Sequence, residues 1–483
     1  MTIKKIISAQ FILFSAFICA QTSVPDDYLR AGYGTDISGS ALSAKEILLT
    51  PKEQLTQEIS VLQQDPVLRY AHWGYAVYDP KTKKLITGYN ESVPLKPAST
   101  TKLLTTDTAY SIFGTKYQWI TQLEYSGILS EEGVLDGNLY IVGSGDPSLG
   151  STQSGASSYW AIVTEYKDAI RNAGIKRIKG NIIIQSGVFK TQNMLLPPHI
   201  VWMEHNNYYL PVGNTQDVKP EDERSVIREK GPLSTIKRYF YISPYTQKAA
   251  YTDSFQAISS LSGKLPSAPA YLANQLRSSL LKSGISVGSV ITKTIDDSPE
   301  ERVFLASTKS PNLEDLIYFT NQTSNNKMAE ALLHISGFYQ NGDFGLESGK
   351  EAIYNHLKKL DFDFNGLSFI DGSGLSHSHR VTPIAQVKFL AHLMEQPYFK
   401  SYFESLPIAG HTGTLKNMFV YNEANGQIFA KTGTLNKVKT LAGYIKTKSG
   451  RTLTFSLLIN DYSGSVAQVK KKMEELLQPT LNL

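Results

Sequence analysis

Short runs of mostly apolar, aromatic and β-branched residues near both ends of the chain predict the strands of one sheet. Residues 73–78 and 84–89 are two such runs, and Asp79-Pro80-Lys81-Thr82 between them is typical of a turn, so the pair predicts a hairpin. Near the other end, residues 441–446 and 452–460 flank Lys448-Ser449-Gly450-Arg451 and predict a second hairpin. A shorter run at 427–430 predicts a strand that leads into Lys431.

Helical spacing of apolar residues marks four other stretches. It predicts helices over 52–64, from Ser99 to about Phe113, from Asn312 through 316–339, and over 466–477. The third stretch is interrupted at Thr323-Ser324-Asn325-Asn326. Helices from the middle of the chain, packed on a sheet made from both ends, predict an α+β layer fold.

The middle of the chain has a different pattern. Residues 134–142, 175–185 and 286–295 read as strands with turn residues between them, so we expect a β-rich insertion. Within it, residues from about 191 to 255 predict a nested subdomain. Its aromatic run 202–209 is either a surface platform or an ordinary packed cluster.

The first twenty residues have the pattern of a secretory signal peptide. Lys4 and Lys5 precede a mostly apolar run, 6–19, and cleavage after Ala20 leaves a loose leader over 21–45. Cys19 is the single cysteine, and Ile18 before it is too bulky for a lipoprotein signal. The processed chain then has no thiol, which excludes disulfides, cysteine nucleophiles and cysteine-based metal sites.

Charge and hydropathy exclude two classes of partner. The formal charge of +5 falls to +3 without Lys4 and Lys5, too little to predict nucleic-acid binding. Glu474 and Glu475 follow the basic run 470–472 on an expected helix, which indicates a solvated face. Beyond the signal, no run of about 18 apolar residues predicts a membrane span.

Three short motifs carry the candidate chemistry. Ser99 and Lys102 stand three residues apart, so on a helix the lysine amine reaches the serine hydroxyl. Ser324-Asn325-Asn326 and Lys431-Thr432-Gly433 follow in order. Together they match the S-x-x-K, S-x-N and K-T-G pattern of penicillin-recognising acyl transferases.

These motifs predict a role for each residue. Ser99 is the expected nucleophile and Lys102 its base, which must be partly neutral; burial and a nearby cation such as Lys431 lower a lysine pKa. Ser324 is expected to relay a proton to the leaving amine, and Asn326 to hold Lys102 and the substrate amide.

The third motif predicts how substrate is held. We expect Lys431 and Thr432 to bind a substrate carboxylate, and Gly433 to let a strand edge approach the substrate backbone. The backbone N–H groups of Ser99 and Thr434 form the expected oxyanion hole. Taken alone, each motif also has a plain alternative: a helix cap with a surface lysine, a turn, and a strand end.

Metal and cofactor chemistry is not predicted. The nine histidines include no H-E-x-x-H, and His377 and His379 share a strand-like spacing without a third ligand, so we expect a satisfied or solvent-facing pair. No phosphate-binding glycine fingerprint is present, and we expect neither metal nor cofactor.

The chain resembles the three-domain D-alanyl-D-alanine carboxypeptidases/endopeptidases, the class C low-molecular-mass penicillin-binding proteins. The resemblance spans nearly all of the processed chain. It is carried by six motifs: Pro97-Ala98-Ser99-Thr100-Thr101-Lys102, Gly145-Asp146-Pro147-Ser148-Leu149, Ser324-Asn325-Asn326, Asp371-Gly372-Ser373-Gly374-Leu375-Ser376, Leu406-Pro407-Ile408-Ala409-Gly410 and Lys431-Thr432-Gly433-Thr434-Leu435.

The resemblance implies a transpeptidase/β-lactamase-like catalytic domain, an antiparallel sheet with helices, that carries a large insertion. Ser324 follows Ser99 by 225 residues, which leaves room for it. We expect catalytic segments at 21–120 and 306–483, with the inserted domain II at 121–305 and the nested subdomain III at about 191–255. The family further implies a periplasmic enzyme that acts on peptidoglycan stem peptides and is acylated by penicillin.

The chain departs from the family at the side-chain pocket that some members use for diaminopimelate. Gln185, His377 and Asn436 stand where those members carry Asp, Arg and Gln. We therefore expect an altered preference at this position of the stem peptide.

Three rival functions remain open. A β-lactamase shares the motifs, but no E-x-x-L-N follows Ser324 and the insertion is large. A non-catalytic cell-wall binding protein does not need intact Ser99, Lys102, Ser324 and Lys431. A generic esterase does not need Lys431-Thr432-Gly433, which suits a free carboxylate.

Overall fold

The computed structural model of the chain describes residues 49–151, 155–185, 203–204, 207–208, 224–227, 238–242, 249–251, 268–293, 300–342 and 345–483. The expected signal peptide 1–20, the leader 21–45 and most of the expected subdomain 191–255, including half of its aromatic run, lie outside the described residues.

A five-stranded antiparallel sheet combines both ends of the described chain. Its order is β16-β17-β18-β1-β2. The strands span Ile428–Leu435, Val438–Lys446, Thr452–Asn460, His72–Asp79 and Lys84–Tyr89, in that order. Both predicted hairpins are confirmed, β1 with β2 and β17 with β18.

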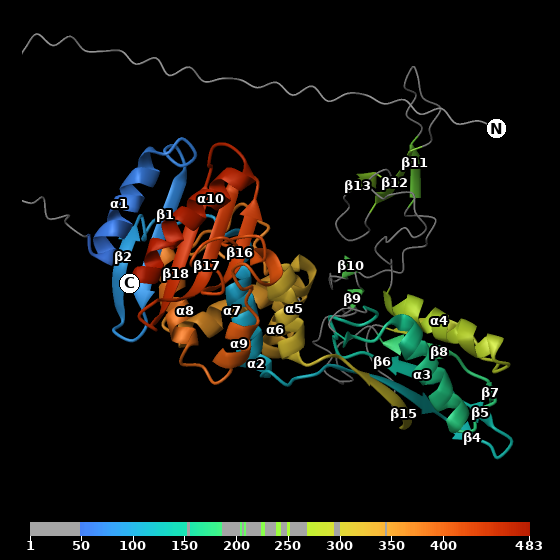
Figure 1. Ribbon diagram of the computed structural model, residues 1–483. Coiled ribbons are helices and arrows are strands. Elements are labelled where there is room, and N and C mark those ends of the chain that lie inside the picture. Colours follow the sequence, from blue (N-terminus) through green and yellow to red (C-terminus); the bar gives the residue numbers. More distant parts are fainter. Residues whose placement is uncertain are drawn as a thin grey trace, which may run out of the picture. The chain divides into compact units, whose positions relative to one another are not determined.

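Helices cover both faces of this sheet, so its strands are apolar on both sides. In β17, Leu441 and Ile445 belong to one buried cluster, whereas Ala442 and Tyr444 belong to another. The first cluster includes α1 (Pro51–Gln64) and α10 (Val466–Leu477) (Figure 1). Each of these helices begins at a capping box, and the predicted helices 52–64 and 466–477 are confirmed.

The second cluster joins the opposite face of the sheet to six helices. They are α2 (Lys102–Phe113), α5 (Leu313–Thr323), α6 (Asn326–Asn341), α7 (Leu346–Lys359), α8 (Pro383–Leu393) and α9 (Phe399–Glu404). The expected interruption of the helical stretch after Asn312 is confirmed as the break between α5 and α6.

A second five-stranded sheet lies between these segments in sequence, in the order β14-β8-β6-β3-β15. The strands span Val290–Lys293, Ile182–Gln185, Leu139–Val142, Ile120–Ser126 and Arg302–Lys309. β14, β8 and β6 run parallel to one another, and β3 pairs antiparallel with β6 and β15.

Two predicted strands are each divided in two. Residues 134–142 form β5 (Val134–Asp136) and β6, and residues 175–185 form β7 (Arg177–Ile178) and β8. β5 pairs with both β7 and β4 (Ile128–Leu129) in a separate small sheet. Gly137 lies at the first break, where a Cβ would stand 1.8 Å from the Ser126 carbonyl oxygen, so only glycine fits this crossing.

The expectation of a β-rich insertion is incomplete, because two long helices cover one face of the second sheet (Figure 1). α3 (Tyr159–Asn172) and α4 (Ala268–Lys282) bury their apolar sides against isoleucines and leucines of β3, β6 and β8. In α3, Ile162, Tyr166 and Ile170 recur every four residues. This helical spacing predicts a helix, which the expectation of a β-rich insertion did not include.

Five short strands are described within residues 203–251. They are β9 (Met203–Glu204), β10 (Asn207–Tyr208), β11 (Arg224–Ile227), β12 (Arg238–Ile242) and β13 (Ala249–Tyr251). β9 pairs with β10, and β12 pairs with both β11 and β13.

Candidate active site

Ser99 lies in a short 3₁₀ turn, η1 (Ala98–Thr101), which leads directly into α2. The prediction of a helix that starts at Ser99 was therefore one turn early, and Lys102 is the first residue of α2. The expected contact is nevertheless present, because Lys102 Nζ lies 3.0 Å from Ser99 Oγ. Ala98 has a φ of 48°, a strained value for a residue with a side chain, immediately before the serine.

Lys102 is completely buried, so the alternative of a surface lysine is wrong. Its amine has three partners: Ser99 Oγ, Asn326 Oδ1 at 2.7 Å and the carbonyl oxygen of Ser373 at 2.6 Å. Burial lowers the pKa of Lys102 to about 7, although the charges of Glu330 and Asp371 act in the opposite direction. A substantial fraction of this lysine is therefore neutral near pH 7.

Ser324 and Lys431 form a second contact beside the first. Ser324 has a left-handed φ of 56° at the break between α5 and α6, and Lys431 Nζ donates to its Oγ at 2.8 Å. Lys431 also donates to the carbonyl oxygen of Thr432. Burial lowers the pKa of Lys431 well below its usual value, and the charges of Lys102 and Lys439 lower it further.

The structure thus brings the residues of the three motifs together. Asn326, the first residue of α6, links the second motif to Lys102, and Ser324 links it to Lys431.

Gly433 is needed for a contact within the protein. A Cβ at this position would lie 2.7 Å from the carbonyl oxygen of Pro97 and 2.1 Å from Thr440 Oγ1. Thr440 Oγ1 itself donates to the Pro97 carbonyl oxygen at 2.7 Å. The glycine lets β16 lie directly against the turn that carries Ser99, whereas the sequence reading assigned it to close approach by substrate.

The outer edge of β16 is free beyond its first three residues. Ala430 N–H donates outward to the Pro407 carbonyl oxygen, away from β17. Alternate residues of a strand direct their backbone groups to the same side, so the N–H groups of Thr432 and Thr434 also face this edge. Within the described residues, no backbone partner beyond β17 receives either N–H group.

Glu330 and Asp371 were assigned no role from the sequence. Glu330, one helical turn after Asn326 on α6, accepts the N–H groups of Gly372 and Ser373. Burial and the Asp371 charge raise the pKa of Glu330. The sequence signal that could have indicated Glu330 is an acidic residue among the mostly apolar buried positions of α6.

Asp371 organises the loop whose carbonyl holds Lys102. Its carboxylate accepts the N–H groups of Ser373, Gly374, Leu375 and Ser376. Burial opposes ionisation, but the contact with His379 and these N–H groups hold the pKa of Asp371 below its usual value. The carboxylates of Asp371 and Glu330 therefore both hold this loop by accepting its N–H groups.

Lys439 was also missed. It lies opposite Thr434 in the β16–β17 pair, and its Nζ donates to Thr434 Oγ1 at 2.5 Å. Burial, and then the charge of Lys470, lower the pKa of Lys439 to about 8. In the described part of the chain no carboxylate pairs with it. The sequence signal that could have indicated Lys439 is a lysine at a strand position that the hydrophobic pattern predicts to be buried.

The residues predicted for a side-chain pocket come from three separate segments. Gln185 ends β8, and its side chain lies outside the described residues; His377 and Asn436 are exposed, the latter at the β16–β17 turn. His377 and Asn436, which are both described, are not joined by a hydrogen bond, so the pocket stays a prediction. His379 is buried against Asp371.

Among the described residues, no group of three or more His, Cys, Asp or Glu side chains is placed to hold a metal ion. The two carboxylates whose charges act on Lys102, those of Glu330 and Asp371, both accept backbone N–H groups.

Comparison with known families identifies the class of protein. The model of the D-Ala-D-Ala carboxypeptidase 3 (S13) family matches residues 55–222 and 254–480, so the chain belongs to this family. The sequence-based identification is confirmed. The D-alanyl-D-alanine carboxypeptidase DacB of Haemophilus influenzae is 25% identical over 443 residues, which cover 85% of this chain and 90% of the relative.

Another relative and a solved structure extend this comparison. The D-alanyl-D-alanine carboxypeptidase of Actinomadura sp. (strain R39) is 26% identical over 455 residues, 85% of this chain and 82% of the relative. Penicillin binding protein 4 (dacB) from Haemophilus influenzae has a TM-score of 0.64 at 21% identity, over 90% of this chain and 100% of that one. The predicted fold class is confirmed.

Glu330→Gln tests the electrostatic setting of Lys102. Removing an anion makes the ammonium form of Lys102 less stable, so its pKa falls and the neutral base persists to lower pH. We expect the acid limb of the penicillin acylation rate to move down by on the order of one pH unit. Stopped-flow acylation between pH 5 and 9 measures it, and a limb that stays in place or moves up contradicts the assignment.

Proposed function

We propose that the protein is a serine-type D-alanyl-D-alanine carboxypeptidase that cleaves peptidoglycan stem peptides through an acyl-enzyme on Ser99. Membership of the S13 family supports the activity. The observation that carries the mechanism is the buried Lys102 amine, 3.0 Å from the Ser99 hydroxyl.

The three partners of Lys102 explain how it acts as a base. In the neutral amine, two N–H bonds satisfy Asn326 Oδ1 and the Ser373 carbonyl oxygen, which leaves the lone pair for the Ser99 hydroxyl. As Ser99 Oγ bonds to the carbonyl carbon of the penultimate D-alanine, its proton passes to Lys102. The cationic form then donates to all three partners.

Collapse of the tetrahedral intermediate breaks the C–N bond and releases D-alanine. The leaving amine needs a proton, and we assign the Ser324 hydroxyl, which accepts a hydrogen bond from Lys431, to relay it from Lys102. Water then attacks the acyl-enzyme, loses its proton to Lys102, and frees Ser99.

The free edge of β16 supplies the backbone contacts for this reaction. An extended peptide that pairs with this edge meets the outward N–H groups of Thr432 and Thr434. The Thr434 N–H, together with that of Ser99, forms the proposed oxyanion hole.

The C-terminal carboxylate of the substrate is the remaining charge to be bound. Lys431 is buried and already donates to Ser324 and Thr432. Its ammonium form therefore has one N–H left for direct contact with a carboxylate. Thr432 and Thr434 offer hydroxyls on the same face of β16, and Lys439 supports Thr434 from the neighbouring strand. We assign Lys439 to the recognition of this carboxylate, alongside Lys431 and Thr432.

The other candidate functions have less support. The family assignment favours a peptidase over a β-lactamase or a generic esterase. A binding protein has no use for a buried, partly neutral lysine beside a serine. Endopeptidase activity on cross-linked peptides is part of the proposal. In a cross-link, the residue that follows the cleaved bond is also D-configured and also carries a free carboxylate, so the site proposed for a terminal D-alanine would hold it too.

The proposal includes export and processing. Residues 1–20 form the proposed signal peptide, and the periplasm is the proposed location. Within the described ranges, every helix is too short or too polar to cross a bilayer. Segments 21–120 and 306–483 form the proposed catalytic domain, with domain II at 121–305 and subdomain III within it.

Ser99→Ala tests the nucleophile. We expect a fluorescent penicillin to label the wild type covalently and to leave no band on the variant, since the acyl bond forms at this oxygen. Denaturing gels measure the label, and thermal unfolding checks that the variant is folded. Label on both proteins would place the nucleophile elsewhere, and no label on folded wild type would favour the binding protein.

Lys439→Met tests carboxylate recognition. A charge-assisted contact contributes about 1.5–3 kcal/mol, so we expect KM for a peptide ending in free D-Ala-D-Ala to rise about tenfold or more, with kcat little changed. The same peptide with a C-terminal amide should show no difference between the two enzymes. Lys437→Met, an exposed lysine two residues earlier, is the matched control. Equal KM values in wild type and Lys439→Met would remove the assignment.

The altered pocket predicts a changed preference at the third stem-peptide residue. With Gln185 and His377 in place of charged partners, and Asn436 in place of a glutamine, we expect diaminopimelate-containing and lysine-containing peptides to be cleaved at similar kcat/KM. Parallel assays of the two peptides measure this ratio. A strong preference for the diaminopimelate peptide contradicts it.

A further inference from the structure

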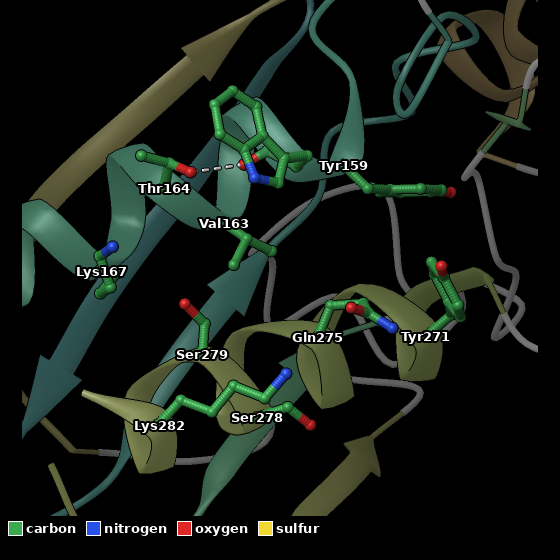
Figure 2. Close-up of a pocket in the computed structure, with 10 residues that line it drawn as sticks. Tyr159, Val163, Thr164, Lys167, Tyr271, Gln275, Ser278, Ser279 and Lys282 are labelled. Atoms are coloured by element: carbon green, nitrogen blue, oxygen red, sulfur yellow. Dashed lines mark hydrogen bonds between the residues drawn. The ribbon is translucent and has the colours of Figure 1, made fainter. Parts of the chain in front are cut away.

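A groove runs between α3 and α4, on the second sheet and apart in sequence from the motifs of the candidate active site. Its volume is about 410 Å³, which is within the range of small-ligand sites. Figure 2 shows Tyr159, Thr164 and Lys167 of α3 opposite Tyr271, Ser279 and Lys282 of α4.

Aromatic rings lie at one end of the groove. Trp160 has 78% of its surface exposed and Tyr271 has 38%, and the rings of Tyr271 and Tyr159 meet edge to face with centroids 5.4 Å apart. Flat rings presented to solvent offer an apolar face to a ligand that is itself partly apolar, such as the C–H face of a sugar ring.

The rest of the lining is polar and cationic. Gln275, Ser278 and Ser279 present amide and hydroxyl groups that both donate and accept, as sugar hydroxyls require. Lys167 and Lys282 line the same groove, and no carboxylate is among its described lining residues. A neutral sugar does not need two lysines, but a sugar polymer that carries carboxylates does.

We infer that the groove between α3 and α4 binds a carboxylate-bearing glycan, which, given the proposed function, is the amino-sugar strand of peptidoglycan where stem peptides have been removed and the carboxylates that held them are free. Rings hold the sugar faces, the hydroxyl and amide groups hold their polar edges, and the lysines attract the carboxylates. Such a site binds the enzyme to the polymer, and it makes no contact with a soluble peptide substrate.

The experiment compares the full chain with the double variant Trp160→Ala/Lys282→Gln. Both positions are exposed, so the fold is preserved. Tyr70→Ala/Lys81→Gln is the matched control, because Tyr70 is similarly exposed, at 73%, and Lys81 lies in the β1–β2 turn. Binding is measured by co-sedimentation with insoluble peptidoglycan that has been partly stripped of its stem peptides, and catalysis by penicillin labelling and soluble-peptide hydrolysis.

We expect the groove variant to bind insoluble peptidoglycan at least about fivefold more weakly than wild type and the control, with unchanged labelling and soluble-peptide hydrolysis. Glycan strands stripped of peptides should compete for wild-type binding, and strands with amidated carboxylates should compete poorly. Unchanged sedimentation of the groove variant overturns the inference, as does equal competition by poly-glutamate.

These outcomes separate the groove from the proposed function. If wild type is neither labelled nor active on soluble peptide, the proposed function fails. If it is labelled and active while the groove variant sediments normally, the inference about the groove fails and the proposed function stands.

Discussion

The burial of the Lys102 amine is the constraint on which the site depends. A lysine removed from water is stable only if its hydrogen-bonding capacity is met, and here Ser99, Asn326 and Ser373 meet it. Asn326 Oδ1 and the Ser373 carbonyl oxygen only accept, whereas the Ser99 hydroxyl accepts from the ammonium or donates to the lone pair of the neutral amine. The arrangement therefore supports both the neutral amine and the ammonium, which is what a group that takes and returns a proton requires.

Each partner of Lys102 is held by a different part of the fold. α2 presents the lysine, the start of α6 presents Asn326, and Asp371 and Glu330 fix the loop that presents the Ser373 carbonyl. The apolar helices on this face of the sheet supply the burial that shifts the pKa. On the other side of η1, Gly433 brings β16 into contact, so the free strand edge stands beside the serine.

Sequence patterns predicted the elements with strong periodicity and the motif residues, because a strand or helix that faces a core must repeat its apolar positions. β2, β18 and α10 matched the expected ranges 84–89, 452–460 and 466–477. Spacing also predicted the contact of Ser99 with Lys102, which needs only local geometry. Contacts that arise from tertiary packing were not accessible: nothing local pairs Glu330 with the Gly372 and Ser373 amides, or directs Gly433 at Pro97.

The pH dependence of penicillin acylation of the wild-type protein tests the central claim most directly. If burial makes Lys102 the base, the rate rises with pH to a midpoint near 7 and then levels, because the amine is deprotonated above its lowered pKa. A rate that keeps rising tenfold per pH unit to pH 10 would show an ordinary lysine, and would contradict the role given to burial.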